Sequence, residues 1–175
     1  MDGILRKLPI GIQTFEKLRE GDYLYVDKTA LVWRIASTET PYFLSRPRRF
    51  GKSLLLSTFE AYFEGKKNLF EGLAIADMEK EWKTYPVFHL DLNAEKYDSP
   101  QALVEILSRQ LTQWELKYGK GEDEETLSGR FAGVIRRACE QSGRGVVVLV
   151  DEYDKPLLQA LGDDALLDDY RKPLK

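Results

Sequence analysis

A glycine-lysine-serine tripeptide, Gly51 to Ser53, stands between a short apolar run and an amphipathic stretch. If a helix begins there, its first turn has unpaired backbone N–H groups and the positive end of its dipole, so it can bind a phosphate. Lys52 would then reach the β- and γ-phosphates, and the Ser53 hydroxyl would take a place on Mg²⁺. Gly51 would let the backbone approach the phosphate without a colliding side chain. The tripeptide therefore predicts a phosphate-binding loop.

The loop departs from the usual pattern G-x-x-x-x-G-K-[ST] at its first position, where residues 46–53 read RPRRFGKS. Proline stiffens this loop by fixing one φ angle, and an arginine could supply to phosphate oxygens the charge that a glycine-rich loop supplies through backbone donors. The alternative is a basic surface turn whose arginines face solvent or an acidic partner. The predicted nucleotide-contacting residues are Arg46, Pro47, Arg48, Arg49, Phe50, Gly51, Lys52, Ser53 and Leu54.

A second motif, VVVLVDEYD at 146–154, places acids directly after five apolar residues that favour β-structure. In a nucleotide hydrolase, Asp151 at the carboxyl end of such a strand would hold Mg²⁺, and Glu152 would polarise the attacking water. The alternative is that both acids begin a turn or cap the next helix. Finding this motif about 100 residues after Lys52 favours a shared site. We therefore predict Lys52 and Glu152 as catalytic residues and Ser53 and Asp151 as metal ligands.

The elements that must position these residues follow from the apolar periodicity. Strands are predicted at 42–45, at 86–93 and at the start of 146–154. Helices are predicted at 52–64, from Ser99-Pro100 to Gly119, from Leu127 to Gly143, and over a short stretch at Leu157 to Leu161. Alternating strands and helices indicate an α/β fold. Because the VVVLV run is apolar on both faces, it should lie in the middle of a parallel sheet covered by helices.

Composition bounds the remaining possibilities. The 175 residues suit one domain, and the net charge of −3 argues against a protein that coats nucleic acid, although not against a local basic patch. A single cysteine, Cys139, and a single histidine, His89, leave no internal disulfide and no ordinary zinc site. No apolar run is long enough for a signal peptide or a membrane span. We therefore expect a cytoplasmic protein without a membrane partner.

Four stretches together resemble the AAA-ATPase-like family: residues 8–32, residues 42–65, YPVFHLDLN and VVVLVDEYDKPLL. Its members are predicted P-loop ATPases of bacteria and archaea, often joined to a C-terminal PD-(D/E)XK nuclease-like domain. The resemblance covers about Leu8 to Leu158, and RPRRFGKS and DEYDKP are specific to it. It implies ATP as the ligand, a three-layer P-loop NTPase fold with a mostly parallel sheet, and an arginine-rich phosphate loop as the family's normal form.

The resemblance also bears on domain organisation. Related P-loop ATPases use about five parallel strands, whereas three are recognisable here, so we expect the N-terminal part of a longer ATPase whose sheet is incomplete at the C-terminus. An open sheet edge would invite self-association. Residues 1–35 are expected to form a segment packed on an ATPase core, 36–175. Within that segment YVDKT, 25–29, is expected near the nucleotide, although Asp27 as a helix cap is the simpler interpretation.

Three functions remain open from the sequence. The first is an Mg²⁺-dependent ATPase that uses the two motifs together. The second is a nucleotide-gated interaction module that binds ATP without hydrolysing it, which the degenerate loop favours. The third is nucleic-acid binding through Arg46, Arg48 and Arg49, against which stand the net acidic charge and the lack of an aromatic platform beyond Phe50.

Overall fold

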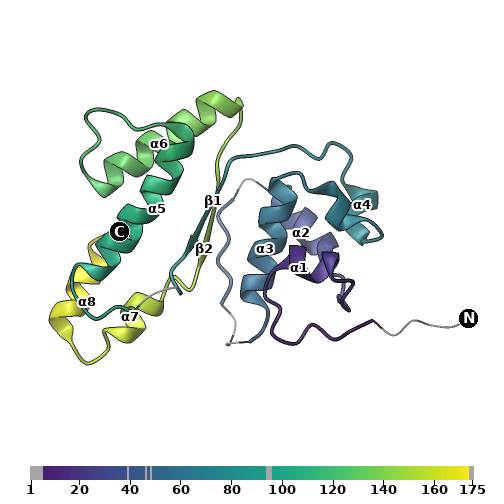
Figure 1. The fold of residues 1–175 in the computed structure, drawn as a ribbon, viewed down its shortest axis with the longest axis horizontal. Coiled ribbons are helices and arrows are strands. Elements are labelled where there is room, and N and C mark those ends of the chain that lie inside the picture. Colours follow the sequence, from purple (N-terminus) through teal and green to yellow (C-terminus); the bar gives the residue numbers. More distant parts are fainter. Residues whose placement is uncertain (1–5, 39, 46, 48, 94–95, 174–175) are drawn as a thin grey trace, which may run out of the picture. The chain divides into compact units, whose positions relative to one another are not determined.

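Backbone contacts divide the chain into two compact units, Met1–Tyr85 and Pro86–Lys175, called here the N-terminal and C-terminal units. The computed structural model describes residues 6–38, 40–45, 47, 49–93 and 96–173. Figure 1 shows the course of the backbone through both units.

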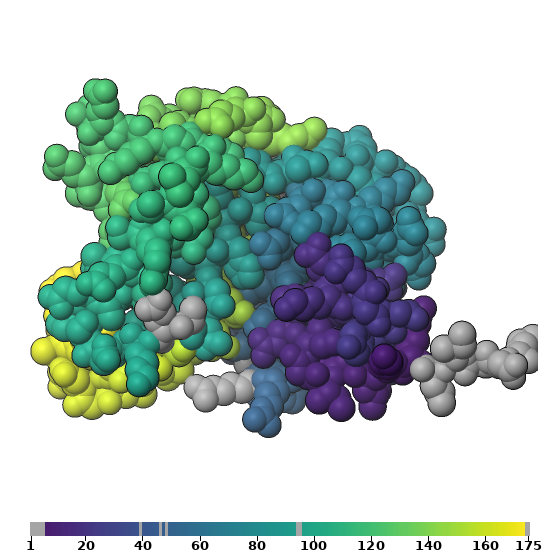
Figure 2. Space-filling model, in the orientation of Figure 1, coloured from purple at the N-terminus to yellow at the C-terminus, as the bar shows by residue number. Residues whose placement is uncertain are grey.

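The described part of the N-terminal unit is helical. Its elements are α1 (Phe15–Glu20), α2 (Thr29–Ala36), α3 (Lys52–Phe63), the 3-10 turn η1 (Lys67–Phe70) and α4 (Ala74–Met78). Its core is aromatic and aliphatic, because Phe15, Leu18 and Phe70 are almost completely buried. The purple surface of the residues around α1 and α2 lies against the blue surface of α3 (Figure 2). A hydrogen bond from the Phe15 N–H to Ser57 Oγ, 2.9 Å long, joins α1 to α3.

The YVDKT motif holds α2 and α4 together. One Asp27 carboxylate oxygen accepts from the Thr29 N–H at 2.8 Å, and the other accepts from the Ala74 N–H at 2.7 Å. Thr29 Oγ1 in turn accepts from the Ile75 N–H at 3.1 Å. The first two N–H groups of α4 are thus satisfied by side chains that come from the start of α2. Asp27 thus accepts from the N–H groups with which α2 and α4 begin, but the N-cap position of α2 is Lys28, one residue later than predicted.

The C-terminal unit is a mixed α/β structure around a parallel pair of strands. Its elements are β1 (Val87–Asp91), α5 (Ala102–Tyr118), α6 (Leu127–Ser142), β2 (Val147–Asp151), α7 (Lys155–Gln159) and α8 (Asp164–Arg171). The register runs from Val87 opposite Val147 to Asp91 opposite Asp151. Parallel strands need a long crossover, and α5 and α6 supply it. The two acids at the ends of β1 and β2 therefore lie on neighbouring strands at the same edge.

Helices α5 and α6 cover β1. Phe88 is fully buried and stacks on Trp114 of α5 with ring centroids 4.5 Å apart. The same cluster includes Val134 and Ala138 of α6, both fully buried. A buried ion pair between Glu115 and Arg130 adds a polar tie between the two helices.

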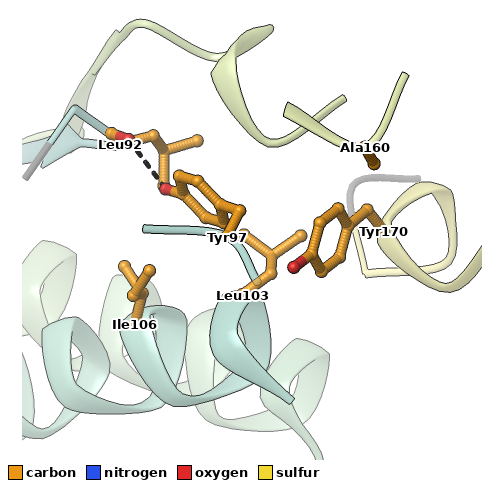
Figure 3. Packing of buried hydrophobic residues seen from close by; sticks show 6 residues of the cluster. All are labelled: Leu92, Tyr97, Leu103, Ile106, Ala160 and Tyr170. Atoms are coloured by element: carbon orange, nitrogen blue, oxygen red, sulfur yellow. Dashed lines mark hydrogen bonds between the residues drawn. The ribbon is translucent and has the colours of Figure 1, made fainter. Parts of the chain in front are cut away.

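A second cluster packs α7 and α8 onto the chain that leaves β1. It comprises Leu92, Tyr97, Leu103, Ile106, Ala160 and Tyr170. Figure 3 shows the Tyr97 hydroxyl donating to the Leu92 carbonyl at 2.7 Å, with the Tyr170 ring beside it. The Tyr170 hydroxyl donates to the Ser99 carbonyl, also at 2.7 Å. The segments that follow β1 and β2 are therefore fixed to each other within this unit.

Two predictions about strands are wrong. Residues 42–45 are not part of either strand that the structure describes, and the side chains of Tyr42, Phe43 and Leu44 are exposed. Apolar character alone does not make a strand, because its backbone groups need a partner strand. The VVVLV run is also not buried on both faces, since Val148 and Val150 are 43% and 39% exposed. Helices α5 and α6 pack over β1, which leaves these two side chains uncovered.

The observed fold is mixed α/β with a small parallel sheet, as the sequence predicted in its coarse form. A three-layer P-loop fold with a wider sheet stays a prediction, as does the division into residues 1–35 and 36–175. Among the described residues, no helix has both the length and the apolar character that crossing a bilayer requires.

Candidate nucleotide-binding site

The loop before α3 has the backbone of a helix start that only glycine adopts easily. Gly51 is the N-cap of α3 and has φ +74° and ψ +25°, in the left-handed region. A Cβ added to Gly51 would meet no atom within 4 Å, so the conformation rather than crowding requires glycine there. Arg49 also has a positive φ, +67°. The chain thus turns sharply twice before the helix begins.

The predicted phosphate ligands lie in the first turn of α3. Lys52 and Ser53 are both half-buried, and that turn contains no acidic residue that would compete with a phosphate. Pro47, Arg49 and Phe50 are exposed, as a loop that meets a ligand requires. The predicted ligands Arg46 and Arg48 lie outside the described residues.

Hydrogen bonds and buried side chains fix helix α3, which carries this turn. The Leu54 carbonyl accepts from the Ser57 hydroxyl at 2.9 Å and from the Thr58 hydroxyl at 2.7 Å. Thr58 and Phe59 are buried, so the helix is anchored one turn beyond the loop. Gly65, with φ +71°, follows its C-terminal end, where the sequence predicted the stop.

The predicted metal ligand, Asp151, is the last residue of β2 and is only 6% exposed. Its Oδ1 accepts from the Glu152 N–H at 2.9 Å, and no described cationic side chain forms an ion pair with it. A nearly buried carboxylate needs a counter-charge. Mg²⁺ in nucleotide sites is held by one or two carboxylates together with phosphate oxygens, so Asp151 fits such an ion. The described residues contain no cluster of three or more potential metal-binding side chains.

Glu152, the predicted catalytic acid, stands in an unusual backbone conformation directly after Asp151. Its φ is +52°, which is uncommon for a residue with a Cβ. The Lys155 N–H donates to the Glu152 carbonyl at 2.9 Å and closes a tight turn. Strained conformations of this kind cluster at functional sites.

Sequence reasoning overlooked two polar residues at the same edge of the sheet. Lys155 Nζ donates to the Asn93 backbone carbonyl and to Asn93 Oδ1, the latter at 3.0 Å. The Asn93 N–H donates to Asp91 Oδ1 at 2.7 Å. The available signal was position, since Asn93 comes two residues after β1 and Lys155 four residues after β2, and parallel strands end at one edge.

The two halves of the predicted site lie in different units. Lys52 and Ser53 belong to the N-terminal unit, and Asp151 and Glu152 to the C-terminal unit. Within the units, Gly51 stands at the start of α3 and Asp151 at the end of β2. That the two halves bind one nucleotide stays a prediction.

The family model described as Predicted AAA-ATPase matches residues 9–175, and the chain therefore belongs to that family. A relative from Azotobacter chroococcum mcd 1, named "Uncharacterized protein in vnfD 5'region", is 45% identical over 157 residues. The match covers 89% of this chain and 30% of that relative. No solved structure matches the chain significantly. Membership of a family of predicted ATPases supports nucleotide binding in general.

Proposed function

We propose that the chain is an Mg²⁺-dependent, ATP-hydrolysing domain. The observation that carries the proposal is the start of α3, where Gly51 in the left-handed conformation precedes Lys52 and Ser53 in the first helical turn. This is the local backbone that a phosphate-binding helix terminus needs. Family membership supplies the second, independent support.

Each residue then has a defined role. Lys52 neutralises the β- and γ-phosphates, and the first-turn N–H groups of α3 donate to phosphate oxygens. The Ser53 hydroxyl and the Asp151 carboxylate would hold Mg²⁺, and the bound ion would supply positive charge to the transferred phosphoryl group. Glu152 accepts a proton from the attacking water. Arg49, and Arg46 and Arg48 with it, add positive charge around the phosphates.

Calorimetric titration with ATP in the presence of Mg²⁺ tests the binding step. Lys52→Ala removes charge-assisted hydrogen bonds and should weaken binding about 10- to 100-fold. Lys67→Ala, which removes an exposed lysine from η1 of the same unit, is the matched control and should bind like the wild type. Equal affinity in all three proteins would refute the proposed phosphate site.

A turnover assay separates hydrolysis from binding. Glu152→Gln removes the proton acceptor, so it should lower kcat about 10²- to 10⁴-fold while ATP still binds. ATP binding without turnover above the Glu152→Gln background would instead identify a nucleotide-gated module. If ATP does not bind at all, both the ATPase and the nucleotide-gated module are refuted.

A further inference from the structure

We infer that Lys155 is a positioning residue for Glu152, which it holds through Asn93 at the carboxyl edge of the sheet. The inference rests on the proposed ATPase function for its catalytic consequence. The physical tie itself lies entirely within the C-terminal unit.

The turn after β2 is fixed by two hydrogen bonds that backbone N–H groups donate, one to a side chain and one to a backbone carbonyl. The Glu152 N–H donates to Asp151 Oδ1 and the Lys155 N–H donates to the Glu152 carbonyl, both at 2.9 Å. The two hydrogen bonds close the turn on either side of Glu152. The φ of Glu152 is +52°, and a positive φ is less favourable than a negative one for a residue with a Cβ. Such a conformation persists only where its surroundings enforce it.

The side chain of Lys155 attaches this turn to the neighbouring strand. Its ammonium group donates to both oxygens of Asn93, one on the backbone and one on the side chain. The Asn93 N–H is bound to Asp91 Oδ1, and the Leu92 N–H donates to the Asp151 carbonyl at 3.1 Å. Asp91 and Asp151 are register partners. The contacts therefore form a closed ring from one strand end to the other.

This ring explains why a half-buried lysine follows the acids. Lys155 makes no described ion pair with Asp91, Asp151 or Glu152, although all three lie on the same edge. The donors of Lys155 are directed to the two neutral oxygens of Asn93, so Lys155 ties the turn to the neighbouring strand without pairing with Asp91 or Asp151. A group that orients a general base in this way acts on turnover rather than on substrate affinity, because the ground state makes no contact with it.

The test compares Lys155→Met, which keeps the aliphatic stem and removes the donors, with Lys155→Arg, which keeps donors and charge. Lys80→Met is the matched control, since Lys80 Nζ also donates to a backbone carbonyl, that of Asp77, at an exposed helix end. We expect Lys155→Met to lower kcat about 10- to 100-fold, with KM for ATP changed less than about twofold. Lys155→Arg should recover part of the rate, and Lys80→Met should match the wild type.

Two further measurements distinguish positioning from general destabilisation. In a double-mutant cycle, Lys155→Met should add little to Glu152→Gln, because both act on one step. Amide hydrogen exchange should accelerate at residues 152–155 in Lys155→Met and not in Lys80→Met. Full additivity in the cycle, or unchanged exchange at the turn, would overturn the inference.

The outcomes also separate this inference from the proposed function. A wild type that hydrolyses ATP beside a Lys155→Met variant with unchanged kcat keeps the ATPase and refutes the positioning role. A wild type without turnover refutes the ATPase and with it the catalytic consequence, whereas the exchange experiment still decides whether Lys155 holds the turn.

Discussion

Replacing Arg130 by methionine should be among the most destabilising single changes in the C-terminal unit. Arg130 Nε donates to Glu115 Oε1 at 2.8 Å, and its NH2 group donates to Oε2 at 2.7 Å. The guanidinium also donates to the hydroxyls of Ser108 at 2.6 Å and Thr112 at 3.0 Å. The Glu115 side chain is only 6% exposed, so Arg130→Met would leave a carboxylate nearly buried without its cation.

Removing one member of a buried ion pair costs about 3–5 kcal/mol. We expect about 3 kcal/mol here, the lower end of that range. The reason is that Glu115 lines an open pocket of about 410 Å³ together with Lys120, so water and a second cation can partly compensate. Both groups already act on Glu115: the hydrogen bond from Arg130, and to a lesser extent the charge of Lys120, lower its pKa.

Urea unfolding followed by tryptophan fluorescence measures this change, since Trp114 packs in the same unit. Arg136→Met is the control: its side chain is 67% exposed and 3.8 Å from Glu124, so it should cost less than about 1 kcal/mol. Adding Glu115→Leu to Arg130→Met should recover most of the loss, because no buried charge then remains. A loss below about 0.5 kcal/mol for Arg130→Met, or no recovery in the double variant, would refute the reasoning.

Three further predictions follow from local geometry. Gly51→Ala forces a Cβ into the left-handed region at a cost of about 1–2 kcal/mol, and calorimetry should show weaker ATP binding; unchanged affinity would mean that this backbone is not needed. Asp27→Ala leaves the Ala74 N–H without its acceptor and should destabilise the N-terminal unit by about 1 kcal/mol in thermal unfolding. An unchanged unfolding temperature would contradict the role of Asp27 in joining α2 to α4. The hydrogen bond from Arg137 lowers the pKa of Glu124 to about 2 from 4.5, so Glu124 stabilises the fold above pH 4.5 and that contribution fades as pH falls towards 2. Glu124→Gln should therefore lose less stability across that pH range than the wild type does, and parallel acid-denaturation curves would contradict this.

Periodicity was sufficient for β1 and β2 and for the three longer helices, α3, α5 and α6. The steps of four, four and three through Leu103, Leu107, Leu111 and Trp114 predicted α5. Gly143, with φ +65°, follows the end of α6 as expected. The apolar runs at 86–93 and 146–154 predicted β1 and β2, because β-branched and aromatic residues there leave few alternatives. These signals are local, and here the packing of the unit agrees with them.

Features that depend on contacts between residues far apart in the sequence could not be predicted from the sequence. Residues 42–45 have the composition of a strand, yet strand formation depends on a neighbour that composition does not specify. The exposure of Val148 depends in the same way on which strand α5 and α6 cover. The tie from Lys155 to Asn93 spans 62 residues and requires the register of β1 against β2, which no single stretch encodes.

The same distinction between local signals and long-range contacts applies to the candidate site. The sequence indicated a glycine at the start of α3 and an acid at the end of β2, and the structure has Gly51 and Asp151 at these positions. Their meeting at one nucleotide is a relation between the two units and stays the central claim to be tested.

One measurement tests it directly: nuclear magnetic resonance of the ¹⁵N-labelled chain with ATP and paramagnetic Mn²⁺ in place of Mg²⁺. An ion bound by both Ser53 and Asp151 should broaden the amide signals of residues 51–53 and of residues 151–152 in the same sample, and an excess of Mg²⁺ should restore both. Broadening confined to one of these two groups would contradict a shared nucleotide site.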